Sequence, residues 1–281
     1  MSPQPLLMIL GSALLGFLGA SLLVPVFLND PPKRLMRRNV NGREVPAVLG
    51  WPLALGGAIA LVSVAIAAMA GWDPAPKGEV TLALAVVLAV MTSAGAWDDR
   101  GGDESSRGFK GHLGALARGR ITGGVLKILA GGVAGFGAGA ILFPGDPARL
   151  VATAVLVAST ANLVNLFDRA PGRAGKVALL LTIPLLAFGH TGWAIAAAGM
   201  AGGLLACLPV DLTERAMLGD AGANPLGAII GLGVAVSLDG AALWVAAASI
   251  VGLNLASERW SFSQAIARTP WLDLLDRAGR K

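Results

Sequence analysis

Long uncharged apolar runs recur along this chain and constrain its fold more than any other feature. A helix needs about 20 consecutive apolar residues to cross about 30 Å of hydrocarbon, and several runs reach that length. The runs are continuous rather than alternating, which favours helices over the strands of a membrane barrel. Only 14% of the 281 residues are charged, whereas a soluble domain carries about a quarter. The sequence therefore predicts an all-α, polytopic transmembrane helix bundle and excludes an ordinary soluble enzyme.

The basic residues between the runs predict how the bundle is oriented. Nineteen of the 22 Lys and Arg residues follow odd-numbered runs, and two follow even-numbered runs. Because cytoplasmic loops carry the excess of basic residues, we expect the N-terminus outside and the C-terminus in the cytoplasm. Residues 1–257 would form the membrane domain with its functional loops in the cytoplasm, and residues 258–281 an amphipathic cytoplasmic tail. The nine expected spans are 5–28, 46–70, 79–96, 121–143, 150–167, 177–188, 192–209, 224–237 and 240–256.

Two adjacent carboxylates, Asp98 and Asp99, lie where the third run meets the predicted cytoplasmic side. Adjacent carboxylates repel each other unless a cation or a proton lies between them. Magnesium suits such a pair, because it binds one or two carboxylates and completes its octahedron with phosphate and water. The alternative interpretation is a solvated turn that closes a helix.

A polar stripe ends the fifth run. Asn162, Asn165 and Asp168 are spaced by three residues, which places them on one face of a helix. Polar groups in a membrane helix normally face the bundle interior or an aqueous cavity. The stripe is therefore a candidate binding surface. The alternative is that the two Asn side chains only form hydrogen bonds between helices and that Asp168 is a terminal charge.

Two more charged residues complete the candidate set. Asp220 lies between glycines in the segment 217–225, where the backbone can approach a phosphate or a metal closely. The alternative is a flexible turn before a helix that starts at Asn224-Pro225. Lys127 lies inside the fourth run, roughly 9 Å from its start at 1.5 Å per residue. Its ammonium group either neutralises a carboxylate or a substrate phosphate, or snorkels to the lipid headgroups.

In this order, the motifs resemble those of the polyprenyl-phosphate N-acetylhexosamine-1-phosphate transferase superfamily, glycosyltransferase family 4. The motifs are the Asp-Asp pair, the Asn-x-x-Asn-x-x-Asp stripe and Met-Leu-Gly-Asp-Ala-Gly at 217–222. The loop Asn39–Pro46 also looks like the first cytoplasmic loop of the family, and the match extends from about residue 30 to residue 235. Members include the bacterial phospho-N-acetylmuramoyl-pentapeptide transferase and the undecaprenyl-phosphate GlcNAc-1-phosphate transferases.

The resemblance implies a magnesium-dependent glycosyl-1-phosphate transferase of the bacterial inner membrane that acts in cell-wall or other envelope-glycan synthesis. A polyprenyl phosphate, such as undecaprenyl phosphate, would attack the β-phosphate of a UDP-sugar and release UMP. Because two anions must meet, a metal ion and a lysine are needed. The expected partners are these two substrates and the membrane lipids, with no nucleic acid. The small residues on the helix faces permit a homodimer.

The resemblance also implies residue roles, position by position. Asp98, Asp99 and Asp168 would be catalytic, with the two adjacent carboxylates orienting or deprotonating the lipid phosphate. Asp220 would be the main magnesium ligand, together with Asp168. The substrate-binding residues would be Asn162, Asn165 and Lys127. One shared site requires the four carboxylates to converge within about 15 Å, the reach of one magnesium-diphosphate cluster.

Two departures from the family pattern favour other interpretations. Pro171 stands where the family has a second Asp, and the late cytoplasmic histidine motif is absent. A catalytically reduced relative that binds lipid-linked phosphate, or scaffolds envelope-glycan assembly, is therefore the main alternative. Arg169 and Arg173 could serve phosphate in place of the missing groups. A secondary transporter is less favoured, because its ionisable groups would lie near the bilayer midplane rather than at one face.

Overall fold

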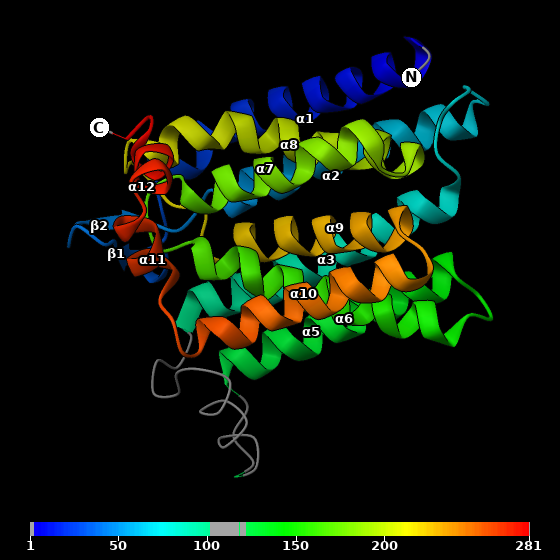
Figure 1. The fold of residues 1–281 in the computed structure, drawn as a ribbon. Helices are drawn as coiled ribbons and strands as arrows, with labels where there is room; N and C mark the ends of the chain where they lie inside the picture. The colour runs from blue at the N-terminus through cyan, green and yellow to red at the C-terminus, as the bar shows by residue number, and fades with distance from the viewer. Residues whose placement is uncertain (1–2, 102–117, 119–121, 281) are drawn as a thin grey trace.

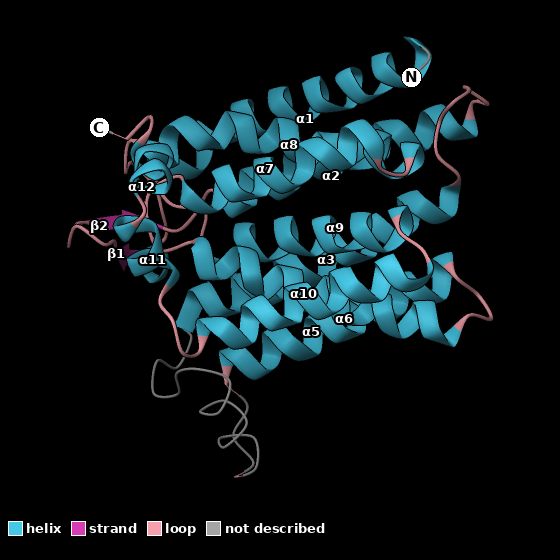
Figure 2. Cartoon of the chain, viewed as in Figure 1, coloured by secondary structure: helices cyan, strands magenta, loops and turns pink. Residues whose placement is uncertain are grey.

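The computed structural model describes residues 3–101, 118 and 122–280, and this part of the chain is helical except for one short hairpin (Figures 1 and 2). The long helices are α1 (Pro3–Asn29), α2 (Gly50–Met69), α3 (Gly78–Gly101), α5 (Gly123–Leu142), α6 (Pro147–Phe167), α7 (Arg173–Phe188), α8 (Thr191–Leu212), α9 (Asp220–Ser237) and α10 (Gly240–Ser257). The short elements are η1 (Lys33–Leu35), β1 (Met36–Arg38), β2 (Glu44–Pro46), α11 (Phe262–Arg268) and α12 (Pro270–Arg277).

Long helices occupy all nine runs that the sequence marks as spans, and seven of them are long and apolar enough to cross a membrane. These are α1, α2, α3, α5, α6, α8 and α10, so the all-α, multi-pass prediction is confirmed at this level. The other two are α7 and α9. α7 has 16 residues and reaches about 24 Å, short of the hydrocarbon thickness.

The long helices form two packed groups. In the first, α1, α2 and α8 contact one another; in the second, α9 contacts α3, α5 and α6, and α5 contacts α3 and α6 (Figure 1). Small residues allow the backbones of α1 and α8 to approach closely. A Cβ on Gly202 would lie 1.8 Å from the main-chain oxygen of Ala13. Such contacts are typical of helix association in lipid, where packing replaces the hydrophobic effect.

α9 is the central helix of the bundle. It packs against α2, α3, α6 and α7, and most of its side chains are buried. A helix that is apolar on all sides is surrounded either by lipid or by other helices, and its contacts place α9 among other helices. α9 begins at Asp220, one of the candidate site residues. The central position of α9 therefore places Asp220 among the surrounding helices.

The hairpin β1–β2 and the helices α11 and α12 gather at one end of the bundle, which is the left end in Figure 1. The strands pair antiparallel, with Met36 opposite Pro46. The tail that the sequence predicts to be amphipathic contains α11 and α12. α12 leaves Trp271 and Leu274 exposed, whereas Asp276 is buried.

Candidate functional site

An ammonium group between two carboxylates is the centre of the candidate site. Lys127 of α5 lies with its Nζ 2.6 Å from Oδ2 of Asp98 on α3 and 2.5 Å from Oδ2 of Asp220 on α9. All three side chains are largely buried, at 14–19% exposure. Buried charges are stable only when they are paired, so this triad joins three helices. Lys127 therefore neutralises carboxylates in this structure rather than snorkelling to the headgroups.

The second oxygen of Asp220 is also engaged. Asn165 of α6 donates from Nδ2 to Oδ1 of Asp220 at 2.8 Å and to Oδ1 of Asn224 at 2.9 Å. Asp220 is thus held by a cation on one side and by an amide on the other. The structure places Asn165 beside Asp220, where the sequence predicts a shared site.

Asp99 holds the first turn of α9. Its Oδ1 accepts the N–H of Asp220 and its Oδ2 accepts the N–H of Ala221, each at 2.9 Å. The first N–H groups of a helix have no partner within that helix, and the N-cap position here is Gly219, which has no side chain. Asp99 supplies the missing cap from another helix. Asp98 therefore faces the ammonium of Lys127, whereas Asp99 positions α9.

Asp168 reaches the same turn from the end of α6. Its carboxylate accepts the N–H of Gly219, the residue before α9. Loss of contact with water, followed by the charge of the nearby Asp211 carboxylate, raises the pKa of Asp168 well above its ordinary value. A bound cation would relieve both effects. All four predicted carboxylates thus converge on the first turn of α9.

Asp211, near the end of α8, is a site residue that the sequence does not single out. It is 3% exposed, and its Oδ2 has no hydrogen-bond partner among the described residues. Its other contact is the N–H of Gly172. A buried carboxylate oxygen without a partner is costly, which marks the position as functional or strained. The local sequence, Pro209-Val-Asp211, contains no motif that would have indicated it.

Asn162 faces a different neighbour from Asn165. Its Nδ2 donates to Oδ1 of Asn254 on α10 at 2.6 Å, and Asn254 donates in turn to the main chain of Ser159 at 3.0 Å. The alternative role, a hydrogen bond between helices, is the one that this structure shows for Asn162. α6 lies between α9 and α10, so two residues on one stripe reach different helices.

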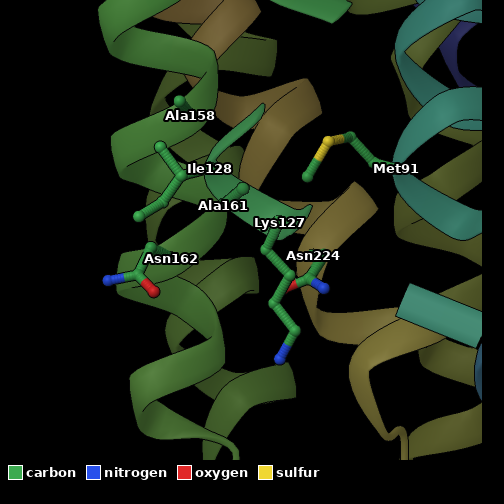
Figure 3. Close-up of a pocket in the computed structure, with 7 residues that line it drawn as sticks. All are labelled: Met91, Lys127, Ile128, Ala158, Ala161, Asn162 and Asn224. Carbon is green, nitrogen blue, oxygen red and sulfur yellow. The ribbon is translucent and has the colours of Figure 1, made fainter. Parts of the chain in front are cut away.

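A small cavity adjoins the triad inside the bundle. Figure 3 shows Asn162 and Asn224 on either side of Lys127 in this view, with Met91 beside the space. The cavity has a volume of about 10 Å³, room for about one water molecule. Asn224 is 1% exposed, and its Nδ2 has no partner among the described residues. The cavity therefore extends the site into the bundle, with Lys127, Asn162 and Asn224 as its polar lining residues.

The hairpin fixes the loop that leads to Asp220. Met217 donates its N–H to the carbonyl of Pro46 at 3.0 Å. Glu214 accepts from the side chains of Asn39 at 2.7 Å and Asn41 at 2.6 Å. Glu214 has φ of 55°, an uncommon conformation for a residue other than glycine. The loop Asn39–Pro46 that carries part of the resemblance thus serves as a brace for the loop before α9.

The two arginines that the sequence offers as phosphate-binding groups differ in whether their side chains are free to bind a ligand. Arg173 is 8% exposed and paired with Asp276, so its guanidinium group is already committed. Arg169 is exposed, and its guanidinium group forms no hydrogen bond or ion pair with the described residues. Arg37, which the sequence analysis does not single out, donates to the main-chain oxygen of Asp99 and supports the end of α3. Of the proposed pair, Arg169 is the one that a phosphate group could reach.

The donor set fits a magnesium ion that is bound together with a phosphate. Within residues 3–101, 118 and 122–280, no three His, Cys, Asp or Glu side chains are arranged to hold a metal by themselves. Magnesium needs only one or two carboxylates and takes its other ligands from water and phosphate. The carboxylates around the first turn of α9 outnumber the one ammonium group, which favours an added cation. Asp168 and Asp220 are the side chains that could hold it.

The chain matches no protein-family model and no curated protein sequence.

Proposed function

We propose that this multi-pass membrane protein is a phosphoglycosyl transferase that moves a sugar-1-phosphate from a UDP-sugar to a polyprenyl phosphate. One oxygen of the lipid phosphate would attack the β-phosphorus of the UDP-sugar, and the bond from that phosphorus to the bridging oxygen of UMP would break. UMP would leave, and a polyprenyl-diphosphate sugar would remain in the membrane. The observation that supports this proposal best is the convergence of four carboxylates and Lys127 on the first turn of α9.

Each site residue would have a distinct role in this reaction. Lys127 would exchange one of its carboxylate partners for a phosphate oxygen, because the ammonium group is already positioned among anions. Asp98, released from Lys127, would orient the lipid phosphate or take its proton. Asp168 and Asp220 would hold a magnesium ion, which would neutralise charge on the diphosphate. Asp99 keeps α9 in place through two amide groups and does not need to touch the substrate.

The distribution of basic residues supports the proposed orientation of the protein in the membrane. The loops at the site end of the bundle hold most of the basic residues, which favours a cytoplasmic face and, for this chemistry, the inner leaflet of a bacterial plasma membrane. UDP-sugars are soluble and reach that face. The exposed Arg169 lies beside Asp168 and is available to the diphosphate.

A catalytically reduced relative remains the second candidate, for a specific reason. Both oxygens of Asp220 are engaged by Lys127 and Asn165, and both oxygens of Asp99 are engaged by the backbone. A site that is internally satisfied in this way can bind a lipid-linked phosphate without turning it over. Pro171 also leaves the loop with one carboxylate fewer than the resemblance implies.

The test is UMP release by the purified protein with undecaprenyl phosphate, magnesium and a panel of UDP-sugars. We expect Asp220→Asn and Asp168→Asn to lower the rate at least a hundredfold. The matched control is Asp239→Asn, an 80% exposed carboxylate paired with Arg149, and its rate should equal that of the wild type. No UMP from any UDP-sugar, or unchanged rates in both site variants, would refute the transferase. Binding of undecaprenyl phosphate without magnesium and without turnover would favour the reduced relative.

A further inference from the structure

The C-terminal helices are bound to the turn that presents Asp168. Arg173, the first residue of α7, donates from Nε and Nη2 to the two carboxylate oxygens of Asp276 on α12, at 2.8 and 2.7 Å. Both side chains are buried, at 10% and 7% exposure. A bidentate pair of this kind fixes orientation as well as distance. It joins residues that are 103 positions apart in the sequence.

Two more cations complete the contact. Lys176 donates from Nζ to the main-chain oxygens of Leu275, Asp276 and Ala278, at 3.0, 2.6 and 2.8 Å. The last carbonyl groups of a helix have no partner within it, so Lys176 satisfies the end of α12. Arg280 bonds Asp276 at 2.6 Å and donates to the main-chain oxygen of Pro171 at 2.9 Å. The tail thus contacts the turn directly at Pro171.

The tail also reaches the residue next to Asp168. The rings of Phe262 on α11 and Phe167 on α6 stack with centroids 5.1 Å apart. From α8, Asp211 accepts the N–H of Gly172, whose φ of 68° favours glycine. Residues 167–176 are therefore held both by α8 and by the C-terminal segment.

We propose that α11 and α12 form a clamp on the Asp168 turn and that Arg173 and Asp276 are its positioning residues. The clamp sets Asp168 against the N–H of Gly219 and the loop of Asp220, so that both carboxylates meet the same cation. Pro171 contributes no polar side-chain group to this turn, and the tail supplies hydrogen bonds and ion pairs that fix it. The part of this inference that concerns cation binding rests on the proposed function; the part that concerns the turn does not.

The first test is hydrogen–deuterium exchange of residues 168–176 in the purified full chain. Asp276→Asn should speed exchange there at least tenfold, because the buried guanidinium of Arg173 loses its charged partner. The matched control is Asp273→Asn, which breaks the exposed pair with Arg277 on the same helix and should leave residues 168–176 unchanged. Equal exchange in Asp276→Asn and the wild type would overturn the clamp.

The second test separates positioning from a merely structural role. In the UMP-release assay, Asp276→Asn should raise the half-saturating magnesium concentration about tenfold, with the rate recovered at saturating magnesium. A lower rate at every magnesium concentration, with an unchanged half-saturation point, would contradict the positioning role. If the wild type releases no UMP, the transferase fails, and the exchange experiment still decides the clamp. If Asp276→Asn does not fold, Arg280→Ala must speed exchange at residues 168–176, and no change would overturn the proposal.

Discussion

Removing the ammonium group of Lys127 is the sharpest perturbation that the structure offers. Lys127 has carboxylate oxygens at 2.6 and 2.5 Å, and each charge-assisted hydrogen bond contributes about 1.5–3 kcal/mol. Lys127→Met keeps an unbranched side chain that is one atom shorter and leaves Asp98 and Asp220 facing each other without a cation. Breaking a buried ion pair in this way costs about 3–5 kcal/mol. Protonation of one carboxyl group relieves part of this, so we expect a net loss of about 3 kcal/mol.

The measurement is thermal unfolding of the detergent-solubilised protein, followed by tryptophan fluorescence. At about 2–4 °C per kcal/mol for a chain of this size class, a loss of about 3 kcal/mol lowers the midpoint by about 6–12 °C. Lys77→Met is the control, because Lys77 is exposed in the loop before α3 and its loss should cost under about 0.5 kcal/mol.

A double variant tests the reason for the loss. Adding Asp98→Asn to Lys127→Met removes one of the two opposed charges and should recover about 1–2 kcal/mol, a coupling typical of residues in direct contact. Two results would refute the reasoning. One is a midpoint for Lys127→Met equal to that of the wild type. The other is a double variant that loses the full sum of the two single losses.

Three further predictions concern the surroundings of the site. In Gly95→Ala the new Cβ would lie 2.2 Å from the main-chain oxygen of Asp220, so we expect a lower thermal midpoint and reduced UMP release. Gly132→Ala meets nothing within 4 Å, and an equal effect of both variants would contradict this argument. Asp99→Ala removes the acceptor of two helix N–H groups and should cost about 2 kcal/mol, the upper end of the range for a lost cap, with Asp99→Asn costing about half; equal losses would count against capping. Burial raises the pKa of Asp276, but the hydrogen bond and charge of Arg173 outweigh it, so the pKa lies below the ordinary 3.8. The ion pair therefore contributes stability above pH 3.8 and loses it as the pH falls through the folded-state pKa. The protection of the α12 amides, measured as the intrinsic exchange rate divided by the observed rate, should fall over that pH range.

Much of the architecture follows from the order of apolar and polar residues. Each of the nine apolar runs becomes a helix, because a backbone in hydrocarbon must satisfy its own hydrogen bonds. The charged residues in or beside these runs also find partners for a physical reason. An ammonium group such as that of Lys127 cannot stay unpaired in an apolar helix, so a carboxylate partner is expected.

The sequence does not predict which partner each of two adjacent or regularly spaced polar residues will meet. Asp98 and Asp99 differ by one position, about 100° around a helix, so one meets Lys127 and the other caps α9. Asn162 and Asn165 share a stripe, but one bonds α10 and the other bonds Asp220. Spacing along a helix determines the direction of a side chain and says nothing about which helix lies there.

The tertiary structure alone decided which distant segments support the site. The apolar runs and the side chains at their ends determined a helical membrane bundle with a carboxylate-rich end. Asp211 and Asp276 carry no local signal, because their environments come from the packing of α8 and α12 around residues 168–173. A buried charge depends on partners that meet it only after the chain has folded. The four carboxylates and Lys127 of the candidate site are therefore visible in the sequence, whereas Asp211 and the contacts that hold the site in place are not.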